Sequence, residues 1–137
     1  MRLLLLAFVL AAVACAKEPP AAPELATGSF TGVGDDALCV AGEAGAQRAG
    51  FVTYGADEAN CSASGTIEPN GDAWTLTPKG DSACSINLRL DPDQVTLGPV
   101  AANCAYYCGP GATYAGKAFR RSPAAANATD LAGDPLC

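Results

Sequence analysis

The chain of 137 residues contains seven cysteines and no histidine, which restricts the chemistry that its side chains are able to do. Without an imidazole, the Ser-His-Asp and Cys-His arrangements, histidine metal ligands and the usual general base near neutral pH are excluded. Cys104 and Cys108 have three residues between them, whereas a thioredoxin-like redox pair has two. These cysteines therefore indicate structural disulfides in an oxidising compartment.

Pairs of acidic residues are the other groups with possible chemistry. They occur at 35–36, 57–58 and 91–93, and two neighbouring carboxylates are able to bind calcium or to act as general acid and base. Each pair falls in a predicted turn, where Asp bonds locally to the backbone. An enzyme that uses these turn carboxylates is therefore the less favoured alternative, and we expect no catalytic residues, no cofactor and no metal.

Alternating apolar and polar residues over 61–67, 73–77, 84–90 and 94–97 predict half-buried strands. Three further strands are expected over 29–33, 37–41 and 48–54, so the predicted fold is all-β. Short turns rich in Gly, Pro and Asp join them. Residues 27–121 are thus expected to form a single antiparallel meander of about seven strands, curled or closed into a small barrel, with Trp74 buried. The segment 112–121 fits a short helix or a last strand, and we favour the helix. A tail over 122–137 ends at Cys137, which would pin it to the domain.

The first 15 residues have the features of an export signal. Arg2 precedes an apolar run from Leu3 to Ala14, which is too short to span a bilayer and is typical of a signal peptide. The run ends in Ala12-Val-Ala-Cys15, which resembles a bacterial lipobox, although that pattern usually has Leu where Ala12 stands. The resemblance implies a signal peptide over 1–14 and a lipid on Cys15.

The number of cysteines also favours a lipid on Cys15 over the alternative, a soluble exported protein with a spare thiol. Lipidation would leave six cysteines, enough for three disulfides. Residues 15–26 then form a Pro- and Ala-rich tether, in which 16–24 is extended and has no core-forming side chains. In lipoproteins of this type, Asp after the lipidated cysteine favours the inner membrane, so Ala16 implies the outer membrane, facing the periplasm.

The remaining cysteines are Cys39, Cys61, Cys84, Cys104, Cys108 and Cys137. Six cysteines allow 15 connectivities. The hairpin of 84–90 and 94–97 returns the chain past Cys84 as it approaches Cys104, which predicts a Cys84–Cys104 bridge. The neighbouring strands around residues 39 and 61 favour Cys39–Cys61, and Cys108–Cys137 would remain.

The net charge and the aromatic residues indicate what kind of partner the protein could bind. The net charge is −6 and basic residues are sparse, which disfavours nucleic acid because phosphate binding needs clustered Lys and Arg. Tyr106, Tyr107 and Tyr114 lie near Lys117 in the sequence and are candidates for an aromatic binding patch. The alternative is that these tyrosines cover a small core.

Three stretches of the chain resemble small cysteine-rich bacterial lipoproteins: Ala12–Cys15, residues 48–65 and residues 104–112. This resemblance covers most of the exported chain and implies no particular activity. Gly111-Ala-Thr-Tyr-Ala-Gly-Lys117, together with the small-barrel character, is similar to periplasmic inhibitors of c-type lysozyme. We therefore expect a membrane-anchored, non-catalytic module that either binds a partner or has a structural role in the envelope. Candidate partners are envelope or extracellular proteins. Inhibition of lysozyme-like enzymes is the alternative function.

Overall fold

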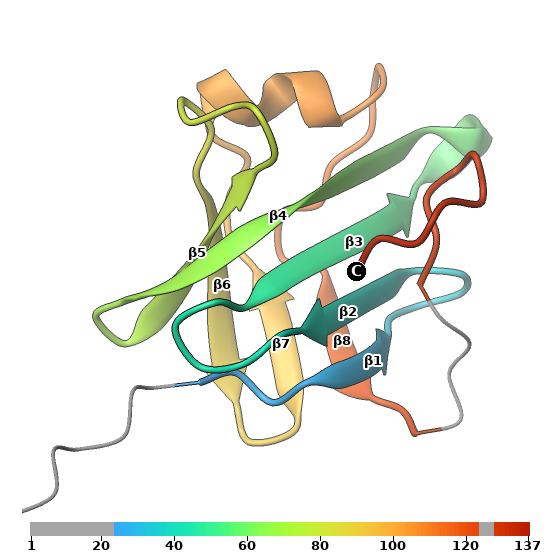
Figure 1. Ribbon diagram of the computed structural model, residues 1–137. Helices are drawn as coiled ribbons and strands as arrows, with labels where there is room; N and C mark the ends of the chain where they lie inside the picture. The colour runs from blue at the N-terminus through green and yellow to red at the C-terminus, as the bar shows by residue number, and fades with distance from the viewer. Residues whose placement is uncertain (1–23, 124–127) are drawn as a thin grey trace, which may run out of the picture.

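In the computed structural model, which describes residues 24–123 and 128–137, eight antiparallel strands form one closed barrel (Figure 1). Each strand pairs with the next one in the sequence, and the last pairs with the first. The strands are β1 (Gly28–Thr31), β2 (Ala37–Ala41), β3 (Arg48–Tyr54), β4 (Asn60–Asn70), β5 (Ala73–Pro78), β6 (Ile86–Asp91), β7 (Gln94–Leu97) and β8 (Ala118–Arg121). The all-β prediction is confirmed, with one strand more than expected. The signal peptide 1–14, the lipidation site Cys15 and the tether up to residue 23 lie outside the described residues.

The additional strand is the segment for which we favoured a helix, and that preference is wrong. β8 pairs with β7 through Val95↔Phe119 and with β1 through Phe30↔Arg121. Phe119 is fully buried inside the barrel. Gly116, in a left-handed turn at φ +71°, separates this strand from the loop before it. Four residues are too few to show a convincing alternation, but they suffice to close the barrel, because closure pairs both edges of the sheet.

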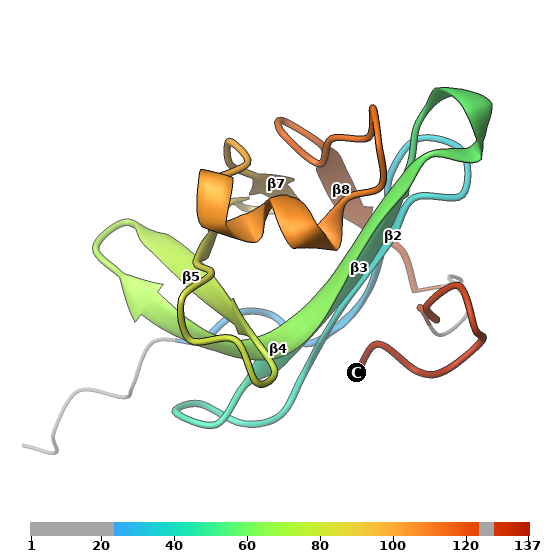
Figure 2. The same cartoon turned by 90° about the horizontal axis from the view of Figure 1, so that it is seen from above.

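The barrel interior is filled by alternate side chains of all eight strands, including Phe30, Leu38, Phe51, Leu76 and Leu88, and Trp74 is buried as expected. The chain needs a glycine at position 65. A Cβ there would lie 1.9 Å from the carbonyl oxygen of Thr77 on the neighbouring strand. A glycine inside a strand is typical of a tight bend at a barrel corner, and β4 is long and curved at this point of the wall (Figure 2).

Residues 98–117, which we call the lid, lie across one end of the barrel (Figure 2). The lid contains the short 3₁₀ helix η2 (Ala102–Tyr107). Two disulfides hold it: Cys84–Cys104 joins it to the β5–β6 loop, and Cys61–Cys108 joins it to the start of β4. The loops β1–β2, β3–β4 and β5–β6 lie at the same end, which we call the lid end.

The third disulfide, Cys39–Cys137, pins the C-terminal tail to the outside of the barrel. Of the predicted pairs, Cys84–Cys104 is therefore confirmed, while Cys39–Cys61 and Cys108–Cys137 are wrong. The reason is the direction of the side chains. Cys61 belongs to the barrel core, whereas Cys39 lies in a separate cluster with Val52 and Leu136 outside the wall. A disulfide cannot join side chains on opposite faces of one sheet without moving the backbone.

The end of the barrel opposite the lid is closed by Leu25, which is fully buried. The buried side chain of Gln47, in the β2–β3 loop, holds its backbone: Leu25 N donates to Gln47 Oε1 at 2.7 Å, and Gln47 Nε2 donates to Leu25 O at 2.7 Å. The chain before Leu25 therefore joins the barrel at this end, which we call the tether end.

Replacing Gln47 by Ala is expected to lower the free energy of unfolding by about 1–3 kcal/mol, because two buried backbone groups of Leu25 lose their partners. Urea denaturation followed by Trp74 fluorescence would measure this. Gln94→Ala is the matched control, since Gln94 is only half-buried and bonds the hydroxyl of Thr96. Equal midpoints for the two variants would contradict the role given to Gln47.

Candidate functional site

The lid presents one aromatic side chain to solvent and uses its neighbour as a support. Tyr106 is 89% exposed, whereas Tyr107 is half-buried and donates from its hydroxyl to Asp81 Oδ2 at 3.1 Å. The two rings meet edge to face, with centroids 5.4 Å apart. Burial, the hydrogen bond to Asp81 and the negative charge of Asp81 together raise the pKa of Tyr107 above its ordinary value. Tyr106 is thus exposed to solvent while its ring packs against Tyr107, which Asp81 holds in place.

Tyr114 does not belong to a surface patch. It is fully buried, with its ring edge to face against Phe51 at 5.3 Å between centroids. Burial raises the pKa of Tyr114, and the backbone of Ala101 partly offsets this. Among the described residues, its hydroxyl makes no hydrogen bond of good geometry. Tyr114 therefore fills the core beneath the lid, which is the alternative that its sequence left open.

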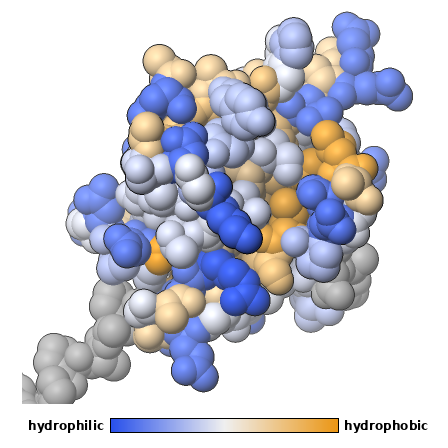
Figure 3. Space-filling view, turned by 45° about the horizontal axis from the view of Figure 1, so that its top comes forward, coloured by the Kyte–Doolittle hydropathy of each residue, from blue (hydrophilic) through white to orange (hydrophobic). Residues whose placement is uncertain are grey.

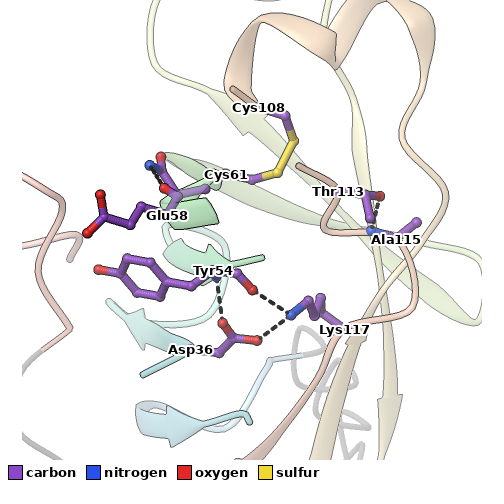
Figure 4. The surroundings of a disulfide bond; sticks show 9 residues. Asp36, Tyr54, Glu58, Cys61, Cys108, Thr113, Ala115 and Lys117 are labelled. Atoms are coloured by element: carbon purple, nitrogen blue, oxygen red, sulfur yellow. Dashed lines mark hydrogen bonds and ion pairs between the residues drawn. A yellow bond between two sulfur atoms is a disulfide. The ribbon is translucent and has the colours of Figure 1, made fainter. Parts of the chain in front are cut away.

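Lys117 is occupied by an internal ion pair (Figure 4). Its Nζ donates to Asp36 Oδ2 at 2.9 Å and to Tyr54 O at 3.0 Å, while Tyr54 N donates to Asp36 Oδ1 at 2.7 Å. Asp36 is almost completely buried, and 29% of the Lys117 side chain is exposed. A buried carboxylate needs such partners, because its desolvation is costly. Lys117 therefore joins the β1–β2 loop, β3 and the lid, and its role in binding stays a prediction.

Two exposed apolar side chains at the lid end were missed by the sequence analysis. Val33, 83% exposed, was placed in the first strand, but β1 ends at Thr31 and Val33 lies in the turn that follows. Tyr54, at the end of β3, is 37% exposed, and its ring points away from the ion pair (Figure 4). Among the described residues, three of the four exposed large apolar side chains lie at the lid end, the fourth being Leu131 in the tail.

Carboxylates accompany these apolar side chains. Asp35, Asp57 and Glu58 are exposed in the β1–β2 and β3–β4 loops. Asp57 and Glu58 both have left-handed backbones, at φ 53° and 59°, a conformation that costs roughly 1–2 kcal/mol per residue. The loop is held by a hydrogen bond of 2.7 Å from Gly55 N to Ala59 O. Figure 3, with the lid end turned forward, shows apolar and hydrophilic side chains interleaved on this face.

The part of the chain that the structure describes contains no group of three or more metal-ligating side chains. No helix within residues 24–123 and 128–137 has the length and apolar character needed to cross a membrane. What the lid end does offer is three exposed apolar side chains on separate segments, with exposed carboxylates in two of its loops.

Comparison with known proteins gives no relative: no family model, no curated protein and no solved structure matches this chain.

Proposed function

We propose that this protein is a non-catalytic binding module that recognises another protein through the lid end of its barrel. The observation that supports the proposal most directly is the projection of Tyr106 from a lid held by two disulfides. Tyrosine is a frequent hot-spot residue in interfaces, because it buries a large rigid area at little cost in conformational entropy. The disulfides keep this cost low for the loop as well.

The partner in this proposal is a protein with a basic surface around an apolar pocket. Asp35, Asp57 and Glu58 accompany the exposed apolar side chains, and the whole chain carries a net charge of −6. Complementary charge increases the rate of association and excludes acidic partners. Binding is accordingly expected to weaken as salt is added, since exposed charges are screened.

The anchor in this proposal is a lipid on Cys15, in the outer membrane and facing the periplasm. Six of the seven cysteines form the three disulfides, so Cys15 is the one cysteine outside these bridges. The chain joins the barrel at Leu25, at the tether end, so an anchored molecule would direct its lid end away from the membrane. Mass spectrometry of the N-terminal peptide tests the anchor, and an unmodified Cys15 would refute it.

Inhibition of c-type lysozyme is the second candidate, supported by the small closed barrel and the negative charge. In Gly111–Lys117, the stretch that resembles such inhibitors, Tyr114 is buried and Lys117 is ion-paired. The charge and the barrel therefore support this candidate more than those two side chains do. Lysozyme activity that is unchanged by micromolar protein at low salt would exclude it.

Tyr106→Ala is expected to weaken capture of the partner by about 30-fold, the effect of a hot-spot residue, without changing the thermal midpoint of unfolding. The protein would be immobilised through its N-terminal segment and exposed to envelope extract and to purified c-type lysozyme. Leu131→Ala is the matched control, because Leu131 is exposed but lies in the tail. A partner retained equally by the wild type and Tyr106→Ala would contradict the assignment of the lid end.

A further inference from the structure

A groove of about 720 Å³ lies on the outer wall of the barrel, below the β5–β6 loop. Its volume is within the range of roughly 300–1,000 Å³ that small-molecule sites occupy. It is lined by residues of β3, β4 and β5, by the β5–β6 loop and by the last two residues of the tail.

The register of the three strands fixes where its polar side chains lie. Arg48, Thr66 and Thr77 are direct neighbours across β3, β4 and β5. One step along the wall toward the lid end, Lys79 N donates to Ser64 O at 3.0 Å. From the usual spacing of strands and residues, the Cα atoms of Arg48 and Lys79 are about 12 Å apart on a diagonal. Ser64 and Thr66 are on β4, the strand between those of the two cationic residues, and Thr77 is the β5 neighbour of Thr66.

The tail forms one side of this groove. A Cβ at Gly50, the β3 neighbour of Ser64, would lie 2.6 Å from the carbonyl oxygen of Leu136, so the tail packs directly on the strand. The Cys39–Cys137 disulfide holds it there. One side of the groove is therefore held in place by a disulfide bond.

Neither cation in the groove forms an ion pair with another side chain. Among the described residues, neither Arg48 nor Lys79 has a carboxylate oxygen within 4.0 Å, since the one ion pair is that of Lys117 with Asp36. Asp81 also lines the groove and keeps its negative charge, but both of its carboxylate oxygens already accept hydrogen bonds. Its Oδ1 accepts from the backbone N–H groups of residues 83 and 84, and its Oδ2 accepts from the Tyr107 hydroxyl.

We propose that this groove binds an acidic saccharide. Two uncommitted cations attract carboxylate groups, and charge-assisted hydrogen bonds are the strongest that such a site can form. The Ser and Thr hydroxyls of the lining match the hydroxyls of a sugar ring, each acting as donor or acceptor. Pro78 and Leu136 add apolar surface to the lining. A neutral sugar would offer neither cation an ionic partner, and a simple anion would not use the hydroxyl groups.

Trigalacturonate is a suitable probe, with maltotriose as its neutral counterpart and sulfate as a simple anion. Titration into the intact protein, followed by calorimetry and by NMR shifts of Ser64, Thr66 and Lys79, is expected to show saturable binding of trigalacturonate alone. Arg48→Gln and Lys79→Gln should each weaken that binding about tenfold. Arg89→Gln, which removes an exposed cation from β6 on another part of the wall, should leave it unchanged.

Thr66→Val removes a hydroxyl but keeps the shape and the charge of the site, and it should also weaken binding. Unchanged melting temperatures would establish that these variants fold. Three results would overturn the proposal: no binding of trigalacturonate, equal binding of maltotriose, or binding of sulfate with the same affinity. Loss of binding in Arg89→Gln would equally overturn it, because general charge attraction would then explain the effect. These outcomes do not depend on the role proposed for the lid end.

Discussion

Removing the Cys61–Cys108 bridge by double replacement with Ala is expected to lower the free energy of unfolding by about 4 kcal/mol, from the entropy of closing a loop of this length. The two cysteines are 47 residues apart in the sequence. Their bridge joins the lid to β4, and Gly109 N donates to Asn60 O at 2.8 Å beside it. Without it, the lid keeps the Cys84–Cys104 bridge, which closes a shorter loop and joins the lid only to the β5–β6 loop.

The double variant Cys39→Ala/Cys137→Ala is the matched control, measured like the first by urea denaturation. The two cysteines of this bridge are 98 residues apart. Chain entropy alone therefore predicts that the free energy of unfolding falls by about 4.7 kcal/mol. We expect a smaller loss, because the released tail regains freedom in the folded protein while the barrel stays closed. A larger loss in this control than in the lid variant would contradict the view that the lid, rather than the tail, completes the domain.

Tyr114→Ala is expected to cost about 3–5 kcal/mol of stability, the range for truncating a large aromatic side chain in a core. The ring is fully buried under the lid and packs against Phe51. Tyr114→Phe should change stability by less than about 1 kcal/mol, because the hydroxyl makes no hydrogen bond of good geometry among the described residues.

Urea denaturation of both Tyr114 variants separates the contribution of the ring from that of the hydroxyl. Tyr106→Ala is the control for losing a lid tyrosine, and with 89% of this residue exposed it should stay within about 0.5 kcal/mol of the wild type. If Tyr114→Phe were as unstable as Tyr114→Ala, the hydroxyl would carry the stabilisation, and the packing explanation would be wrong.

The sequence predicted the strands better than it predicted their closure. Alternating segments such as 73–77 and 84–90 identify half-buried strands, because one face must be apolar. β8 has only four residues, and its place depends on pairing with β1, which is distant in the sequence. Such a contact leaves no local periodic signal, which is why a helix was favoured there.

Two of the three disulfides were mispredicted although a local signal existed. In β2, Cys39 lies between Leu38 and Val40, which both face the core, so alternation places Cys39 on the outer face. Cys61 faces inward like Ala63 and Ile67. Applying the same alternation to the cysteines would have excluded Cys39–Cys61.

The candidate site was predicted only in part, because exposure in loops depends on tertiary packing. Tyr106, Tyr107 and Tyr114 are similar in sequence context, yet they are exposed, half-buried and buried. The 3₁₀ helix turns Tyr106 outward, and the return of the chain across the barrel opening places Tyr114 in the core. Val33 and Tyr54 come to the same end from other loops, and no motif joins them to the lid.

Site-specific photo-cross-linking in intact cells tests the central claim most directly, namely that the lid end is the protein-binding face. A photoreactive amino acid would replace Tyr106 in one variant and Leu131 in another, both positions being exposed. We expect one discrete adduct with a basic protein from position 106, in a yield that falls as salt is raised, and no adduct from position 131. An adduct from position 131 without one from position 106, or the same adduct from both positions, would contradict the claim.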